Sequence, residues 1–172
     1  MSVEDISIES PIEEKISWAE RFYQSKKDQL LGDGIIDNLL IRLKKAVHAS
    51  RGSMAEAGVE CECRRCEDRE GGSCCGIGLE NKYSDTLLLI NLLLDLDLPR
   101  RRHDPQGCYF LGEAGCLLLA RHVICVNYLC KKITAWVDPE KIAKLREKEG
   151  IELELLFFLN ERIKTVLKDI SV

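Results

Sequence analysis

The chain has 172 residues, of which 45% are hydrophobic, 31% are charged and nine are cysteines. Its formal net charge of -4, with only one short basic run at residues 100–102, excludes a general electrostatic attraction to nucleic acid. A chain of this length buries about 70% of its unfolded surface in one core, so we expect a single domain over residues 1–172.

The cellular compartment decides how the cysteines are interpreted. The N-terminal residues are acidic and lack the basic and apolar regions of a secretory signal. The longest apolar run, from Leu87 to Leu94, is far shorter than the roughly 18 residues that span a bilayer. We therefore expect a cytoplasmic protein without membrane contact. In that reducing compartment clustered cysteines bind metal or carry out redox chemistry, and an odd number of them also argues against a disulfide framework.

Helical patterns precede the cysteines. Ser10 is typical of an N-cap, Pro11 of a first helical turn, and Glu13 closes a capping box. The apolar pattern breaks at residues 32–34 and then resumes at helical spacing up to Gly52. The pattern predicts either an antiparallel helix pair or one helix with a break.

The middle of the chain alternates between cysteine-rich and apolar stretches. Residues 58–78 cannot form a continuous apolar face, so a metal is expected to order them. Ser84 then caps a helix from Leu87 to about Leu96, which is apolar on nearly every side and should be buried. Glycines at 112 and 115 separate the runs 108–111 and 116–119, which predicts a short β-hairpin.

The C-terminal part is again helical. One helix is predicted from Asp138 to Gly150, and a second is marked by apolar residues from Leu155 to Ile170. Four aromatic residues at helical spacings are expected in the core: Trp18, Trp136, Phe157 and Phe158.

The expected fold class is mostly α. It is a helical domain with a small cysteine-rich metal-binding element and one short β-hairpin. The cysteine-cluster region spans residues 61–130, and helical segments at 11–52 and 138–170 flank it.

Eight of the nine cysteines form two quartets along the sequence. The first is Cys63, Cys66, Cys74 and Cys75, and the second is Cys108, Cys116, Cys125 and Cys130. The C-x2-C spacing of the first two suits a knuckle that turns two thiolates onto one metal. Adjacent thiols diverge in most backbone conformations, so Cys74 and Cys75 are expected to serve two metal atoms, or one cluster and a second site. This argues against a single closed zinc tetrahedron.

Two alternatives remain open for individual thiols. Cys116 and Cys125 lie among apolar residues, so each could be a small buried hydrophobe rather than a ligand. Cys61 stands outside the eight and is either a free thiol in a solvated loop or a spare ligand.

The order of these residues resembles the CxxCxxCC zinc- or iron-chelating family, the YkgJ-like cysteine-cluster proteins. That pattern has C-x2-C, a vicinal pair, an apolar helix, C-P-F-L, a short turn, C-x-I-Y, and R-P-x2-C-R-x-F-P-C. All eight cysteines match it, although seven residues separate Cys66 from Cys74 where the family usually has two. The segment 121–130 keeps the first arginine but lacks both prolines and the second arginine. The resemblance implies metal or iron-sulfur binding by the eight cysteines.

Arg121 and His122 are the polar candidates for contact with a cofactor. Arg121 could donate to cluster sulfurs or to a carboxylate that orients the loop. His122 is either a ligand or a hydrogen-bonded structural residue. His48 and His103 have no cysteine partner nearby in sequence and are expected at the surface.

The leading hypothesis is a cytoplasmic metal-binding protein. Its thiolates would hold an iron-sulfur cluster or zinc or iron ions for electron transfer, metal handling or an accessory role. One alternative is a cluster-dependent protein-modifying enzyme, because some relatives of this cysteine pattern are joined to flagellin lysine methylation. The absence of a glycine-rich strand-to-helix motif argues against a complete methyltransferase. Another alternative is a structural zinc module for protein-protein interaction. Metal is the expected partner, and the sequence does not identify a protein partner.

Overall fold

The computed structural model describes residues 7, 9–70 and 74–170, and over these the chain is mostly helical, as the sequence predicts. The helices are α1 (Ile12–Leu31), α2 (Gly34–Glu56), α3 (Val59–Glu70), α4 (Asp85–Leu93), α5 (Val123–Asn127), α6 (Lys131–Trp136) and α7 (Pro139–Ile170), together with the 3-10 helix η1 (Leu79–Lys82). A short β-hairpin pairs β1 (Leu111–Gly112) with β2 (Gly115–Cys116).

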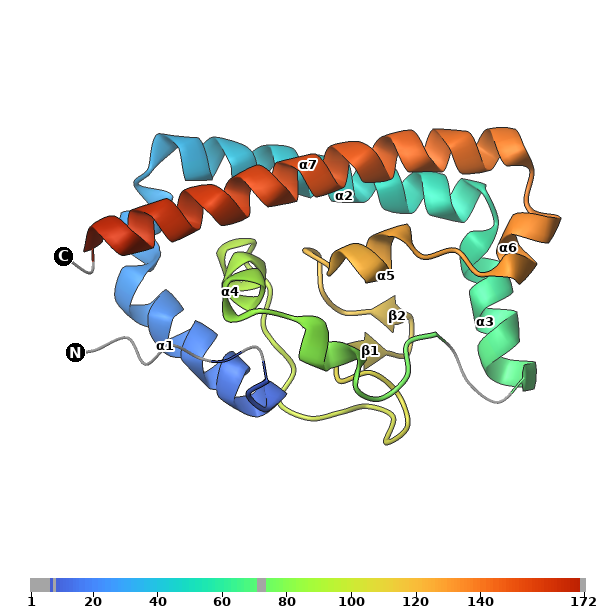
Figure 1. Ribbon diagram of the computed structural model, residues 1–172, viewed down its shortest axis with the longest axis horizontal. Coiled ribbons are helices and arrows are strands. Elements are labelled where there is room, and N and C mark those ends of the chain that lie inside the picture. The colour runs from blue at the N-terminus through green and yellow to red at the C-terminus, as the bar shows by residue number, and fades with distance from the viewer. Residues whose placement is uncertain (1–6, 8, 71–73, 171–172) are drawn as a thin grey trace.

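Helices α2 and α7 form a long antiparallel pair along one side of the molecule (Figure 1). On α2 the buried apolar residues recur at helical spacing from Ile36 to Val47. On α7 Leu155, Leu159 and Ile163 are buried at the same kind of spacing. Because each helix buries one apolar stripe against its surroundings, the two helices pack side by side and form the frame of the fold.

Helix α7 does not end at Gly150, so the prediction of two separate helices after the cysteines is wrong. A glycine inside a helix costs only about 1 kcal/mol relative to alanine. Glu149 and Glu152 are buried on either side of the glycine, and α7 packs along α2. This tertiary packing outweighs the local preference and keeps the helix continuous.

Helix α4 lies below the α2–α7 pair in the view of Figure 1 and packs against α1. The Ser84 side chain accepts the N–H of Leu87 at 3.2 Å, which confirms the predicted N-cap. The helix ends at Leu93, slightly earlier than predicted. Every residue from Thr86 to Leu93 is buried, which confirms the expectation for a helix that is apolar on nearly every side.

The start of α1 differs from the prediction, because Pro11 rather than Ser10 occupies the N-cap position. No side chain caps this helix, and the Pro11 carbonyl accepts the N–H groups of Glu14 and Lys15. The predicted break is present, and Asp33 begins a second helix there. The antiparallel partner of α2 is α7 rather than α1, however.

The hairpin is confirmed but is shorter than the two predicted runs. Leu111 pairs with Cys116 and Gly112 with Gly115, so each strand has two residues and Cys108 lies before β1. Gly115 has a φ of 109°, a conformation that favours glycine and explains the residue type at this turn.

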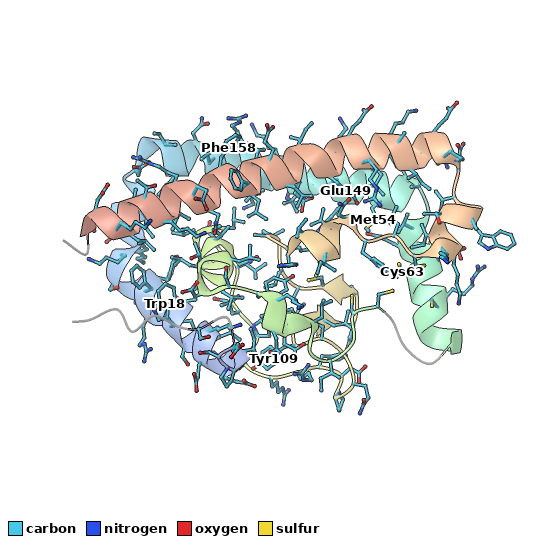
Figure 2. The ribbon with its side chains drawn as sticks, in the orientation of Figure 1. Trp18, Met54, Cys63, Tyr109, Glu149 and Phe158 are labelled. Atoms are coloured by element: carbon cyan, nitrogen blue, oxygen red, sulfur yellow. The ribbon has the colours of Figure 1, made fainter. Side chains whose placement is uncertain are left out.

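Of the four aromatic residues predicted in the core, only Trp18 is buried. It stacks on Phe22 with ring centroids 4.6 Å apart. Trp136 is 78% exposed, Phe157 60% and Phe158 51%, so their assignment to the core is wrong. Figure 2 shows Phe158 on the outer part of α7. Helical spacing shows which residues share a face but not which face is turned inward.

Among the described residues no helix combines the length and apolar character needed to cross a bilayer.

Asp33 both caps α2 and joins it to α7. Its Oδ1 accepts the N–H groups of Ile35 and Ile36, each at 3.0 Å, and its Oδ2 accepts from Nη2 of Arg162 at 2.6 Å. The hydrogen bond from Arg162 outweighs the opposing effect of burial and lowers the pKa of Asp33 below its ordinary value.

We predict that Asp33→Ala lowers the free energy of unfolding at neutral pH by about 1 kcal/mol, the usual cost of a lost N-cap. Asp33→Asn keeps a capping oxygen and should lose only the charge-dependent part. Because the folded pKa lies below the unfolded value of about 3.9, this part is present above the unfolded pKa and disappears as the pH falls through the folded pKa.

Urea unfolding followed by circular dichroism from about pH 3 to about pH 7 measures both effects. Asp28→Asn, at an exposed position on α1, is the control. An Asp33→Asn profile with the same pH dependence as the wild type would contradict the prediction.

Candidate functional site

Helix α3 carries the first three cysteines of the chain. The sequence predicts a solvated loop around Cys61 and a knuckle at Cys63 and Cys66, but all three residues lie on this helix. Residues three apart share a helix face, whereas residues two apart do not. Cys63 and Cys66 are therefore brought together by helical geometry, and Cys61 is exposed and offset from their face.

Four thiols interact where α3 approaches the segment that leads into α6. They belong to Cys63, Cys66, Cys74 and Cys130, and we call them the outer group. Partial burial, followed by the charges of Cys74, Cys130 and Cys66, raises the pKa of Cys63 to about 11. Burial, followed by Cys130 and Cys66, likewise raises the pKa of Cys74. Cys63 and Cys74 are exposed and the other two are half-buried.

A small apolar cluster positions the outer group. Its buried members come from the end of α2, from α3, from α6 and from α7: Ala57, Val59, Ile133, Val137 and Leu145. Met54 and Cys130 pack against it. Figure 2 shows Met54 and Cys63 at this end of the molecule, near the segment between α5 and α6. Cys63 and Cys66 on α3 and Cys130 directly before α6 are thus carried by short elements that share a core separate from the main one, whereas Cys74 lies outside these elements.

The remaining four thiols belong to Cys75, Cys108, Cys116 and Cys125, and we call them the inner group. Cys108 donates its backbone N–H to the carbonyl of Cys75 at 2.6 Å, and Gly76 forms a β-bridge with Gly107. This pairing sets Cys75 beside Cys108. The register of the hairpin then sets Cys116 opposite Leu111.

The inner group lies against the main core. Cys108 belongs to that core, and the three other inner cysteines pack on it. Burial, with a smaller contribution from Glu80, Cys116 and Cys75, raises the pKa of Cys108 to about 12. Burial is also the main cause that raises the pKa of Cys125, and Cys116 adds to it. The inner thiols are therefore less accessible to water than the outer ones.

These groups do not correspond to the two quartets of the sequence. The outer group takes three cysteines from the first quartet and Cys130 from the second, and the inner group takes Cys75 with the remaining three. The vicinal residues Cys74 and Cys75 thus face different groups. This arrangement agrees with the expectation that adjacent thiols diverge, and their service to two metal centres stays a prediction.

Glu80 holds the loop around the inner group. Its carboxylate is 3% exposed and accepts the N–H of Gly78 at 3.0 Å and that of Tyr109 at 3.4 Å. Arg102 also donates to it and to the Gly107 carbonyl, the latter at 2.6 Å. Burial alone would raise the pKa of Glu80, but these hydrogen bonds lower it. Arg102, the last residue of the basic run at 100–102, consequently has a structural role, whereas Arg100 and Arg101 are exposed.

Asn91 clamps the segment that joins the hairpin to α5. It is fully buried on α4, and its Oδ1 accepts the N–H groups of Leu119 at 2.9 Å and Ala120 at 3.0 Å. Its Nδ2 donates to the carbonyls of Leu87 at 3.0 Å and Ala120 at 2.9 Å. One side chain thus fixes the backbone between Cys116 and Cys125.

His122 occupies a structural position beside the inner group. Its Nδ1 accepts the N–H of Ile124 at 3.2 Å, which caps α5, and burial lowers its pKa. The buried Tyr83 donates its hydroxyl to the Cys125 sulfur at 3.7 Å, and burial raises the pKa of that phenol. His103 and His48 are exposed, as expected.

Arg121 is 7% exposed and points into a polar cluster between the cysteine element and the α2–α7 pair. Its Nη2 lies 3.6 Å from Oε1 of Glu152, whose other oxygen accepts a hydrogen bond from Ser50. Of the two roles predicted for Arg121, pairing with a carboxylate is the one that this contact represents. Arg51 donates to the Leu118 carbonyl nearby, and burial followed by the charge of Arg121 lowers the pKa of Arg51.

Sequence reasoning missed several of these residues. Asn91 could have been found, because an amide inside an otherwise apolar helix needs buried hydrogen-bond partners. Glu80, Tyr83, Arg51 and Glu152 have no such local signal. Their importance depends on tertiary contacts with segments about 20 to more than 100 residues away.

Each group fits a soft-ligand metal by donor chemistry, since four thiols are the ligand set of zinc and iron-sulfur sites. Among the described residues, however, no three cysteine, histidine, aspartate or glutamate side chains stand at metal-ligating positions. Metal binding by either group would therefore draw its sulfurs closer together than they lie in this structure.

Comparison with family models, curated proteins and solved structures finds no match to this chain. The resemblance to the CxxCxxCC family stays a prediction that rests on the order of the eight cysteines.

We predict that Asn91→Leu lowers the free energy of unfolding by about 1–3 kcal/mol, because the N–H groups of Leu119 and Ala120 lose their buried acceptor. Urea unfolding measures the change. Asn38→Leu, on the exposed face of α2, is the matched control and should stay within about 0.5 kcal/mol of the wild type. Equal effects of the two substitutions would show that the clamp contributes nothing.

Proposed function

We propose that this chain is a metal-binding cysteine-cluster protein with two four-thiol centres, the outer group and the inner group. The observation that carries the proposal is that eight cysteines from distant parts of the sequence lie in two neighbourhoods of four, within which their thiols interact electrostatically. Unrelated free cysteines would have no reason to gather in sets of that size, which equals the coordination number of a thiolate metal site.

The chemistry of the groups supports a soft-ligand metal, either zinc or iron, the latter as ions or as an iron-sulfur cluster. The burial that raises the thiol pKa values works against thiolates in the metal-free protein, and a bound cation would reverse that effect. The resemblance to the CxxCxxCC family and the expected reducing compartment point the same way.

The two centres differ in their surroundings, which bears on the role of the protein. The inner group lies on the main core, whereas the outer group lies at the surface on the small apolar cluster. We propose that the outer centre is the one that exchanges metal or electrons with a partner. The inner centre would then be the slowly exchanging one.

Elemental analysis of protein purified without oxygen tests the proposal. It should contain zinc or iron in proportion to two centres per chain, and the visible spectrum separates the alternatives, because an iron-sulfur cluster is brown and zinc is colourless. Metal-free protein that takes up neither zinc nor iron under reducing conditions would overturn the proposal.

A cysteine series tests the division into two groups. Cys130→Ser or Cys63→Ser should abolish the outer centre and leave the inner one, because a serine hydroxyl is a poor ligand for a soft-ligand metal. Cys116→Ser should do the reverse. Cys61→Ser is the matched control on the same helix and should retain both centres. Metal content per chain is the measurement, and equal loss in Cys61→Ser and Cys63→Ser would show that the ligand assignment on α3 is wrong.

We further predict that metal removal disorders residues 61–78 and 108–130 while much of the helical content survives. A structural zinc site contributes about 10–16 kcal/mol, which is comparable with the net stability of a whole domain. Helices α1, α2, α4 and α7 nevertheless bury a main core of their own. Circular dichroism and hydrogen exchange before and after chelation check this, and complete loss of the helical signal would contradict it.

A further inference from the structure

A backbone pairing sets two inner cysteines opposite each other. Gly76 and Gly107 form an isolated antiparallel β-bridge, and Cys75 precedes the first glycine while Cys108 follows the second. The Cys108 N–H donates to the Cys75 carbonyl at 2.6 Å. In this register the two cysteines are direct cross-strand neighbours, so their side chains lie on the same face of the pairing.

Further contacts fix this register. Beyond the bridge the Ile77 N–H donates to the Gln106 carbonyl at 2.9 Å. Arg102 donates to the Gly107 carbonyl at 2.6 Å and also to the buried carboxylate of Glu80. Because a slip of one residue would turn each side chain to the opposite face, these contacts keep the two cysteines facing each other.

The geometry of such a pair suits a disulfide. In a hydrogen-bonded antiparallel pair the Cα atoms lie about 5.5 Å apart, and disulfides most often join Cα atoms about 5.5–6 Å apart. The Cβ atoms of facing residues are about 4.5–5.5 Å apart, and a disulfide needs about 3.5–4.5 Å. A small approach is therefore required, and the two glycines next to the pair give the backbone the freedom to make it.

The other thiols are less well placed for this reaction. Cys63 and Cys66 stand three residues apart on α3, where Cβ atoms are about 5–6 Å apart. Cys116 pairs with Leu111 in the hairpin. Within the described ranges no other two cysteines adjoin each other in a β-pairing. A disulfide also needs only two facing thiols, whereas no three candidate ligands in this part of the chain stand at metal-ligating positions.

We propose that Cys75 and Cys108 form a reversible intramolecular disulfide when the metal-free chain meets a low-molecular-weight disulfide such as glutathione disulfide. Cys75 is half-buried and Cys108 is buried, so the oxidant reaches Cys75 first. The Cys75 thiolate attacks one glutathione sulfur, breaks the S–S bond and releases one glutathione thiolate. The Cys108 thiolate then attacks the Cys75 sulfur of the mixed disulfide and releases the second. The two cysteines lose two electrons and two protons, which leave as two molecules of reduced glutathione.

The bond would join two segments that lie on either side of α4 in the sequence. It closes the chain between Cys75 and Cys108, which includes η1 and α4. The inference goes beyond the proposed function and does not depend on it, because the bond needs no metal. Where the inner group holds a metal, the same bond removes two of its four thiols, so oxidation would release that metal.

Peptide mapping of the full chain tests the inference. The protein is freed of metal with a chelator under reducing conditions and is then exposed to glutathione disulfide. The remaining thiols are alkylated before digestion with trypsin. Cleavage after lysine and arginine places Cys74 and Cys75 in the peptide 70–82, and Cys108 and Cys116 in the peptide 103–121. Mass spectrometry should find these two peptides linked, and dithiothreitol should separate them. Non-reducing electrophoresis should show a monomer.

Matched cysteine variants identify the two sulfurs. Cys75→Ser and Cys108→Ala should lose the linked peptides, whereas Cys74→Ser and Cys116→Ser should keep them. Alanine is chosen at position 108 because this residue belongs to the main core. If Cys108→Ala does not fold, as judged by circular dichroism, the comparison of Cys75→Ser with its neighbour Cys74→Ser carries the test.

Each result has a defined meaning. Linked peptides that depend on Cys75 and Cys108 alone support the inference. No link, a link that survives in Cys75→Ser, a link lost in Cys74→Ser or Cys116→Ser, or a disulfide closed within a single peptide overturns it. A chain that forms the bond but takes up neither zinc nor iron overturns the proposed function and leaves this inference standing. A chain that binds metal but forms no such bond does the reverse.

Discussion

The burial of α4 is the constraint on which the rest of the structure depends. A helix that is apolar on nearly every side gains stability only if other elements cover it completely. Helix α1 covers one side and α7 another, and the segment that follows β2 is held against it by three of the four hydrogen bonds of Asn91, the fourth staying within α4. The same requirement therefore forms the helical core and fixes part of the cysteine-rich element.

Polar side chains of α2 and α7 also hold the cysteine-rich element against the helices. Arg51 on α2 holds the Leu118 carbonyl, and Glu152 on α7 accepts from Ser50 on α2 and pairs with Arg121. Arg146 holds the end of α5 through Asn127. The segment from Cys116 to Asn127 buries Leu118, Ala120 and Val126, and side chains that extend from the helices also hold its backbone. The inner thiols inherit their positions from these contacts.

The sequence was sufficient to predict the helical class, the Ser84 cap, the buried α4 and the existence of a hairpin, because each has a local pattern. It failed where tertiary packing outweighed a local preference. Gly150 is an ordinary stop signal, yet α7 continues through it because the packing on α2 extends past that point. The outward positions of Trp136, Phe157 and Phe158 depend on which face the rest of the chain covers, and spacing alone does not contain that information.

The grouping of the cysteines could not be predicted from the sequence for the same reason. Cys130 lies near Cys63 only because α3 and α6 share the cluster around Val59 and Ile133.

The division of the eight thiols has a mechanical consequence. The peptide between Cys74 and Cys75 joins the outer group to the inner one, and the short helix α5 with its following turn joins Cys125 to Cys130. Both connections are too short to absorb a large displacement. A shift that draws the outer sulfurs together would move Cys74 and therefore pull on the adjacent Cys75, whose carbonyl accepts the N–H of Cys108. Arg102 holds the segment before Cys108 in place, because it donates to the Gly107 carbonyl and to Glu80. The inner thiols thus lie on the main core, whereas the outer thiols lie at the end of the molecule where α3 and α6 share the small apolar cluster.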